Sequence, residues 1–294
     1  MRVVTGLVFC FMLLSGGVQA APVLVDSAWL EARLKDSNMV IVDMTEDDLQ
    51  YTRFHLPGAV RLAYHELLQP RGPDKPAARL DERQFAALLG RLGIARDTHV
   101  VIYDDMGGLN AGRLFLELER IRHPQVSVLD GGLVTWVLNG KRVDNTPPLH
   151  KPAHYQPGKA VRANLALLSD VMPSHATAMP LLLDVRTRDE YTGNIKDSRS
   201  GHIPGAHWWP WEQSINMESG FIFREAEALN ASLEKVGLKD RQAPVILYCQ
   251  TGHRASQSYL SLRRLGFENV RVHTGSMREY LMSKAAPVTR GLVP

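Results

Sequence analysis

The chain has 294 residues, of which 45% are hydrophobic and 22% are charged, and its formal net charge is +3. This composition is that of an ordinary globular protein, and the length suits two domains of about 120–140 residues each. Because the small charge is dispersed, with no run of lysine and arginine, nothing in the sequence argues for binding to nucleic acid.

The first twenty residues are typical of a secretory signal peptide. Arg2 supplies a positive start, residues 7–14 are an apolar stretch too short to span a bilayer, and Val18 and Ala20 fit a cleavage site. We expect removal of residues 1–20 and export to the periplasm or the medium, with no stable membrane insertion afterwards. A retained membrane anchor is the alternative.

Strands and helices alternate along the rest of the first half. The expected elements are a helix at 27–34, a strand at 40–43, a turn into a strand at 55–60, a helix at 85–93, a strand at 100–104, a helix around 113–119, a strand at 126–130 and a helix around Trp136. This order predicts an α/β fold, with a mostly parallel sheet and helices on both faces.

The second half repeats this order at a nearly constant spacing of about 144 residues. The segment 55–59 (HLPGA) returns as 202–206 (HIPGA), and Leu183-Asp184 answers Val42-Asp43. We therefore predict two tandem domains. They cover residues 22–140 and 164–290, and residues 141–163, rich in proline and polar residues, form a surface linker.

Cys249 ends a short apolar strand, and the loop 249–254 leads from it into a helix that stops at Gly266. Such a turn faces the sulfur toward backbone N–H groups and the positive end of the helix dipole, which favour the thiolate. Since Cys10 lies in the expected leader, Cys249 has no partner for an internal disulfide. We interpret the loop as a nucleophile cradle for anionic substrates; a buried structural cysteine is the alternative.

Three segments together resemble the two-domain rhodanese family of thiosulfate and 3-mercaptopyruvate sulfurtransferases: 184–186 (DVR), 201–206 (GHIPGA) and the loop 249–254. The resemblance covers essentially the whole mature chain. It implies two tandem rhodanese-like domains, of which the C-terminal one is catalytic. Asp104 stands where the second copy has Cys249, and a carboxylate cannot carry transferable sulfur. We therefore expect the first domain to be chemically silent, walling the cleft and stabilising its partner.

The activity implied is that of a thiosulfate sulfurtransferase (rhodanese). The Cys249 thiolate takes the outer sulfur of a donor such as thiosulfate, releasing sulfite, and a thiophilic acceptor such as cyanide then attacks the persulfide. This chemistry requires no metal and no organic cofactor. Its partners are a small anionic sulfur donor and a thiophilic acceptor.

The positions of the resemblance predict a substrate site around the sulfur. Arg186 and Arg254 would hold the sulfonate oxygens bidentately. Backbone N–H groups of the loop would hold the persulfide, Gly252 would let the loop curl, and Asp184 would support it with hydrogen bonds. For Arg186, an ion pair with an acidic neighbour at 189 or 190 is the alternative. The expected substrate-binding residues are Arg186, Gln250, Thr251, Gly252, His253 and Arg254, with no catalytic role given to His253.

Three other functions compete with this interpretation. A phosphatase resembles Cys-x5-Arg, whereas four residues separate Cys249 from Arg254 here, which favours a ring around a single sulfur. The loop of 3-mercaptopyruvate sulfurtransferases resembles Cys-Gly-Ser/Thr-Gly-Val-Thr without an arginine, so a retained cation favours thiosulfate. A persulfide sulfur carrier for an exported partner stays open.

Overall fold

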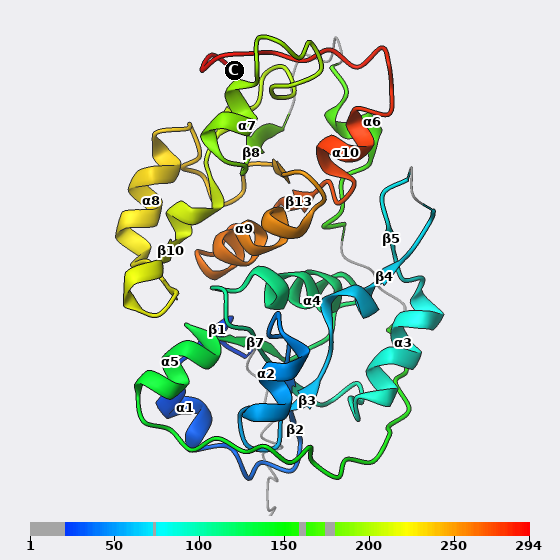
Figure 1. The fold of residues 1–294 in the computed structure, drawn as a ribbon, viewed down its shortest axis with the longest axis vertical. Helices are drawn as coiled ribbons and strands as arrows, with labels where there is room; N and C mark the ends of the chain where they lie inside the picture. The colour runs from blue at the N-terminus through cyan, green and yellow to red at the C-terminus, as the bar shows by residue number, and fades with distance from the viewer. Residues whose placement is uncertain (1–20, 73–74, 159–162, 174–179) are drawn as a thin grey trace, which may run out of the picture.

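The computed structural model describes residues 21–72, 75–158, 163–173 and 180–294. The expected signal peptide and part of the linker lie outside these ranges. The described residues form two α/β domains stacked along the long axis of the molecule (Figure 1). Within these ranges, no helix combines the length and the apolar character needed to cross a membrane.

The N-terminal domain contains a sheet of five strands in the order β1-β7-β6-β2-β3, with every pairing parallel. Alternate residues of its central strand face opposite sides: Val100 and Ile102 join one hydrophobic cluster, and Val101 and Tyr103 join another. Helices cover both sides, which is why the predicted strands are apolar throughout. The strands are β1 (Leu24–Val25), β2 (Met39–Asp43), β3 (Val60–Arg61), β6 (His99–Tyr103) and β7 (Val126–Leu129), and the helices are α1 (Ser27–Glu31), α2 (Asp48–Arg53), α3 (Glu82–Arg91), α4 (Leu109–Arg120) and α5 (Gly132–Leu138).

The C-terminal domain repeats this architecture with a parallel sheet in the order β13-β12-β8-β9. Leu165 pairs with Val272 as a single parallel bridge, at the edge where the first domain has β1. The predicted repeat and the α/β fold class are confirmed. The strands are β8 (Leu181–Asp184), β9 (His207–Trp208), β12 (Val245–Tyr248) and β13 (Val270–Val272), and the helices are α6 (Leu168–Val171), α7 (Arg188–Thr192), α8 (Ala226–Glu234), α9 (His253–Arg264) and α10 (Ser276–Tyr280).

Short elements complete the two domains. Within the described ranges, each domain carries one small antiparallel hairpin outside its main sheet. They are β4 (Leu68–Gln69) with β5 (Ala78–Arg79), and β10 (Ile215–Asn216) with β11 (Ile222–Phe223); the 3-10 turns are η1 (Tyr64–Leu67), η2 (Trp211–Ser214) and η3 (Met217–Ser219).

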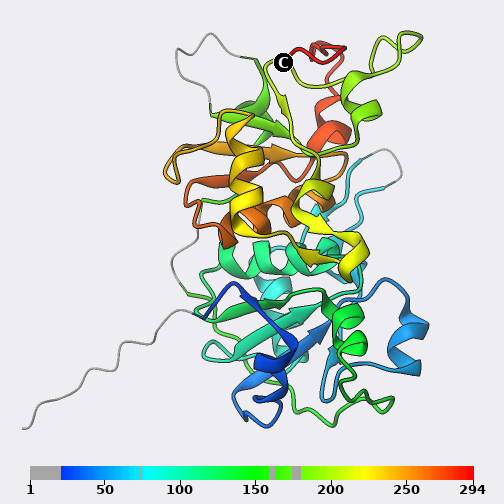
Figure 2. The same ribbon diagram turned by 90° about the vertical axis from the view of Figure 1, so that its left-hand side faces the viewer.

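Helices α4 and α9 pack against each other between the domains, as both views show (Figures 1 and 2). They approach closely because Gly112 has no side chain: a Cβ there would lie 2.9 Å from the Cα of Gln257. At the far end, Glu119 accepts hydrogen bonds from the Tyr259 hydroxyl (2.6 Å) and from Arg263 Nε (2.9 Å). One hydrophobic cluster includes buried residues of both domains, so the first domain packs directly against the second.

Candidate active site

Cys249 follows the last residue of β12 and is a free, buried thiol with 1% of its surface exposed. The backbone N–H of Gly252 donates to its Sγ at 3.1 Å. Ser276 Oγ accepts the N–H of Cys249 at 3.0 Å and lies 3.9 Å from the sulfur. The sulfur is therefore enclosed by backbone and hydroxyl groups, with one loop N–H directed at it.

Gly252 makes this loop geometry possible. Its φ is +88°, a conformation that side chains of L-residues rarely adopt, and a Cβ there would lie 2.5 Å from the carbonyl oxygen of Thr274. It is also the N-cap of α9, which begins at His253. The glycine thus places the sulfur beside the positive end of a twelve-residue helix.

Arg254 lies in the first turn of α9 and forms a bidentate ion pair with Glu190 (2.7 and 2.8 Å). Glu190 is fixed in turn by Thr187, whose N–H (3.1 Å) and hydroxyl (2.9 Å) donate to Oε2. Burial opposes ionisation of Glu190, yet the hydrogen bonds and charge of Arg254 lower its pKa to about 2. A guanidinium has five N–H donors, so this pair leaves Arg254 further donors for an anion.

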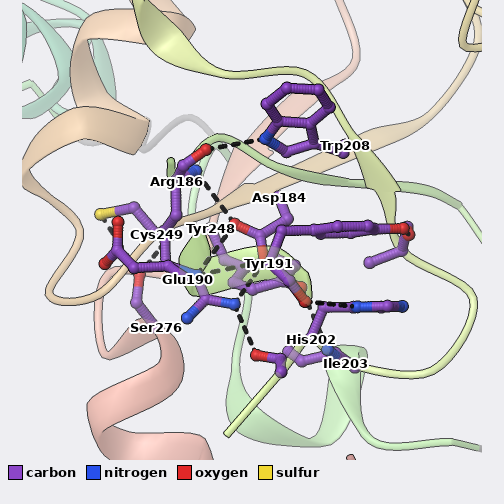
Figure 3. Close-up of polar contacts among 12 residues, drawn as sticks. Asp184, Arg186, Glu190, Tyr191, His202, Ile203, Trp208, Tyr248, Cys249 and Ser276 are labelled. Carbon is purple, nitrogen blue, oxygen red and sulfur yellow. Dashed lines mark hydrogen bonds and ion pairs between the residues drawn. The ribbon is translucent and has the colours of Figure 1, made fainter. Parts of the chain in front are cut away.

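Arg186 takes no part in the ion pair between Arg254 and Glu190. Its side chain is buried and donates to Asp184 (Figure 3) from Nε at 3.0 Å and from Nη2 at 2.6 Å. Nη2 also donates to the carbonyl of Gly201 at 2.7 Å. Burial lowers the pKa of Arg186, but the hydrogen bonds and charge of Asp184 raise it overall. The structure thus gives Arg186 an ion pair with Asp184, and not with residue 189 or 190. These bonds use Nε and Nη2, and Arg186 lines a hollow together with Gln250 of the loop, so its contact with a sulfonate stays a prediction.

The other predicted loop residues take different positions. Gln250 and Thr251 have exposed side chains, and the carbonyl of Gln250 accepts the N–H of Arg278 (3.1 Å). His253 instead reaches the first domain, where its Nε2 lies 2.8 Å from Asn110 Oδ1 and its ring packs on Tyr64 with centroids 4.4 Å apart. Burial lowers the pKa of His253 to about 4, so it is neutral near pH 7.

The counterpart of this loop in the first domain is filled by the chain itself. The Asp104 carboxylate accepts four backbone N–H groups at 2.9–3.0 Å. The loop to its N-cap, Gly108, is one residue longer than the loop from Cys249 to Gly252. Burial raises the pKa of Asp104 although these hydrogen bonds oppose the rise. An internal carboxylate thus occupies the position that a bound anion would take. The four donors are the N–H groups of Met106, Gly108, Asn110 and Ala111.

Several residues of the site were not predicted. Glu190 had a local signal, because Thr187 and Glu190 form a capping box at the start of α7. Ser276 adjoins a glycine of the repeat but carried no sign of its contact with Cys249. Tyr64 and Asn110 come from the other domain, and no local pattern relates them to Cys249.

Two further observations bear on ligands. Among the residues described, no group of three or more His, Cys, Asp and Glu side chains is placed to hold a metal ion. A hollow of about 980 Å³ between α3 and residues 152–157 is lined by no residue of the Cys249 loop. The loop is therefore identified as the candidate site by its buried thiol and the groups around it, and not by the size of a hollow.

Comparison with known proteins agrees with this architecture. The model of the rhodanese-like domain matches residues 26–139 and 168–283. A thiosulfate sulfurtransferase of Corynebacterium glutamicum is 32% identical over 91% of this chain and 90% of its own length, and the sulfur carrier protein TtuD of Thermus thermophilus is 30% identical over 92% and 97%. The crystal structure of SseA from Escherichia coli, described as a 3-mercaptopyruvate sulfotransferase, shares the fold with a TM-score of 0.72 and 22% identity, over 87% of this chain and 99% of that one. Two matches to the family model, together with these relatives, establish that the chain belongs to the rhodanese-like domain family.

Proposed function

We propose that this protein is a thiosulfate sulfurtransferase that carries sulfane sulfur on Cys249. The proposal rests on one observation, the enclosed thiol at the start of α9. The N atom of Gly252 lies 3.1 Å from Sγ, and Arg254 follows in the first turn of the helix. Sulfur transfer is also the activity or role named for the curated relatives in Corynebacterium and Thermus.

The first half-reaction forms a persulfide. The Cys249 thiolate attacks the outer sulfur of thiosulfate, a new S–S bond forms, and the original S–S bond breaks as sulfite departs with its electron pair. The donor and the nucleophile are both anions, so the attack requires positive potential nearby. The dipole of α9 supplies it, the N–H donors that Glu190 leaves free on Arg254 bind the oxygens of the donor, and the Gly252 N–H stabilises charge on the sulfur.

The second half-reaction returns the thiolate. An acceptor such as cyanide attacks the outer sulfur of the persulfide, and the S–S bond breaks with its electrons going to Cys249. Thiocyanate leaves, so the cycle is ping-pong. No proton donor is needed when both the acceptor and the leaving group are anions.

Arg254 favours thiosulfate over 3-mercaptopyruvate as the donor. Thiosulfate is a dianion, whereas 3-mercaptopyruvate carries one carboxylate, so a guanidinium compensates more negative charge in the complex with thiosulfate. Because Glu190 fixes the guanidinium on one edge, the donors left to a substrate have a defined direction. We also propose that the protein works after export, on the strength of its first twenty residues.

The test compares the mature protein with Cys249→Ser. Thiocyanate formation should be measured from thiosulfate and, separately, from 3-mercaptopyruvate, and mass spectrometry after thiosulfate treatment should find one added sulfur on the native protein alone. Activity that survives Cys249→Ser would refute the role of Cys249. A clear preference for 3-mercaptopyruvate would replace the donor while leaving the persulfide in place.

A further inference from the structure

A polar pocket of about 270 Å³ lies between the two domains, beside the catalytic loop. We call it the Tyr64 pocket. Its catalytic-domain wall is His253, and the rest comes from the first domain, including Glu46, Arg61, Tyr64 and Asn110. A domain without a catalytic cysteine therefore builds most of a cavity at the sulfur loop.

The pocket and the sulfur contact two consecutive residues of the chain, His253 and Gly252. The N–H of Gly252 is directed at Sγ, and the next side chain, His253, forms the pocket wall. Tyr64 packs on the His253 ring, with centroids 4.4 Å apart. A molecule in the pocket would thus contact His253, the residue next to the Gly252 N–H that is directed at the sulfur.

The hydrogen bonds of Asn110 determine which atom of His253 faces a ligand. Asn110 Nδ2 donates to the carbonyl of Met44 (2.9 Å) and to Glu46 (3.1 Å), so its Oδ1 must be the acceptor toward the histidine. His253 Nε2 therefore carries the proton, and Nδ1, which has no partner among the described residues, keeps its lone pair. His253 can accept a hydrogen bond from a ligand.

Charge selects the kind of ligand. Arg61 is compensated by Asp48 at 2.6 Å and lies 3.8 Å from the buried carboxylate of Asp43. Glu46, in contrast, forms no ion pair with any residue that the structure describes; its carboxylate accepts only the Asn110 amide. The pocket therefore carries an unneutralised carboxylate beside a histidine acceptor, which attracts a cation and repels an anionic sulfur donor.

We propose that the Tyr64 pocket binds the sulfur acceptor and that this acceptor is a small thiol bearing a positively charged amino group. The inference rests on the proposed persulfide chemistry. The acceptor thiolate attacks the outer sulfur of the Cys249 persulfide, the persulfide S–S bond breaks, the bonding electrons return to Cys249, and a new persulfide leaves on the acceptor. Glu46 holds the ammonium group and His253 Nδ1 accepts one of its N–H groups. The anionic donor thus approaches the sulfur from a positively charged region, and the cationic acceptor approaches it from a negatively charged region.

The test uses thiols of similar size and different charge. Protein loaded with thiosulfate and freed of excess donor is mixed with 2-aminoethanethiol, 2-mercaptoethanol or mercaptoacetate, and loss of the persulfide is followed by mass spectrometry. Rates are expressed per thiolate. We expect the cationic thiol to react fastest and the anionic one slowest, with a spread of about fivefold, the size of one solvent-exposed charge interaction.

Two variants locate the preference. Glu46→Gln should abolish most of the spread. Glu31→Gln, which removes an exposed carboxylate paired with Lys141 in the same domain, should preserve both the spread and the rate of persulfide formation. Equal rates with the three thiols in the native protein would overturn the inference. A difference in rate that survives Glu46→Gln would overturn it as well. Failure to load any persulfide would instead refute the proposed function, so the two failures are distinct.

Discussion

Substitution of Gly252 by alanine gives the sharpest test of how the loop works. Alanine at φ +88° costs about 1–2 kcal/mol in backbone conformation alone. In addition, its Cβ would lie 2.5 Å from the carbonyl oxygen and 2.8 Å from the Cα of Thr274, both backbone atoms. The loop must therefore move, and the N–H that now lies 3.1 Å from Cys249 Sγ moves with it.

The chain offers a matched control in Gly237, which follows α8 in the same domain. Its φ is +87°, almost identical to that of Gly252, but a Cβ there meets nothing within 4 Å. Gly237→Ala should therefore show the backbone penalty without displacement of a neighbour. Any difference between the two variants in unfolding free energy or in reaction rate is therefore due to the displacement of the loop.

The assays are urea unfolding and single-turnover formation of the persulfide from thiosulfate. Gly237→Ala should lose about 1–2 kcal/mol of unfolding free energy and keep its rate. Gly252→Ala should lose at least as much stability and react about 10²–10³-fold more slowly, as when a preorganised donor to a developing charge is removed. If the folded Gly252→Ala protein reacts as fast as Gly237→Ala, the N–H of Gly252 has no part in the chemistry.

Three other predictions follow from the ion pairs and hydrogen bonds. Arg254→Gln should raise the KM for thiosulfate about tenfold or more, and NMR titration should find the pKa of Glu190 raised from about 2 toward its usual value near 4.3; an unchanged Glu190 would contradict the pairing. Asp104→Asn should lower the unfolding free energy by about 1–3 kcal/mol, since an amide cannot accept all four N–H groups; unaltered urea unfolding would contradict this. His253 has its pKa lowered to about 4 by burial, so between about pH 6.5 and 4 the unfolded chain binds a proton that the folded protein does not, and stability falls as the pH falls. His253→Gln should make that decline shallower in urea unfolding at pH 7 and pH 5, and an equal decline would refute the assignment.

Much of the fold followed from local patterns. The repeated HLPGA and HIPGA segments and the alternation of strands and helices predicted two similar α/β domains. Four strands have the same order in both sheets, and the first sheet has β1 as an additional edge strand. Helix starts were less accurate: α9 begins at His253, inside the loop 249–254 that was predicted to precede the helix. The reason is that Gly252, as the N-cap, already directs the chain into the helix.

The sequence predicted some contacts of the candidate site and not others. The loop, Gly252 and Arg254 could be placed because adjacent residues in the chain also lie together in space. Arg186 shows the limit of such reasoning: its position after β8 was correct, but whether its guanidinium reaches substrate or Asp184 depends on packing around Gly201.

The sequence by itself determined that a lone cysteine ends a buried strand at a helix start and that its counterpart in the first domain is Asp104. These features depend on residue identity and short spacing, which sequence records directly. Only the tertiary structure decided that Arg254 is held by Glu190, that Asp104 occupies its own loop, and that His253 faces Tyr64 and Asn110 across the domain boundary. The partners of Arg254 and His253 are separated from them by 64 and 143 residues, so their pairing arises from the packing of whole domains and leaves no local pattern in the chain.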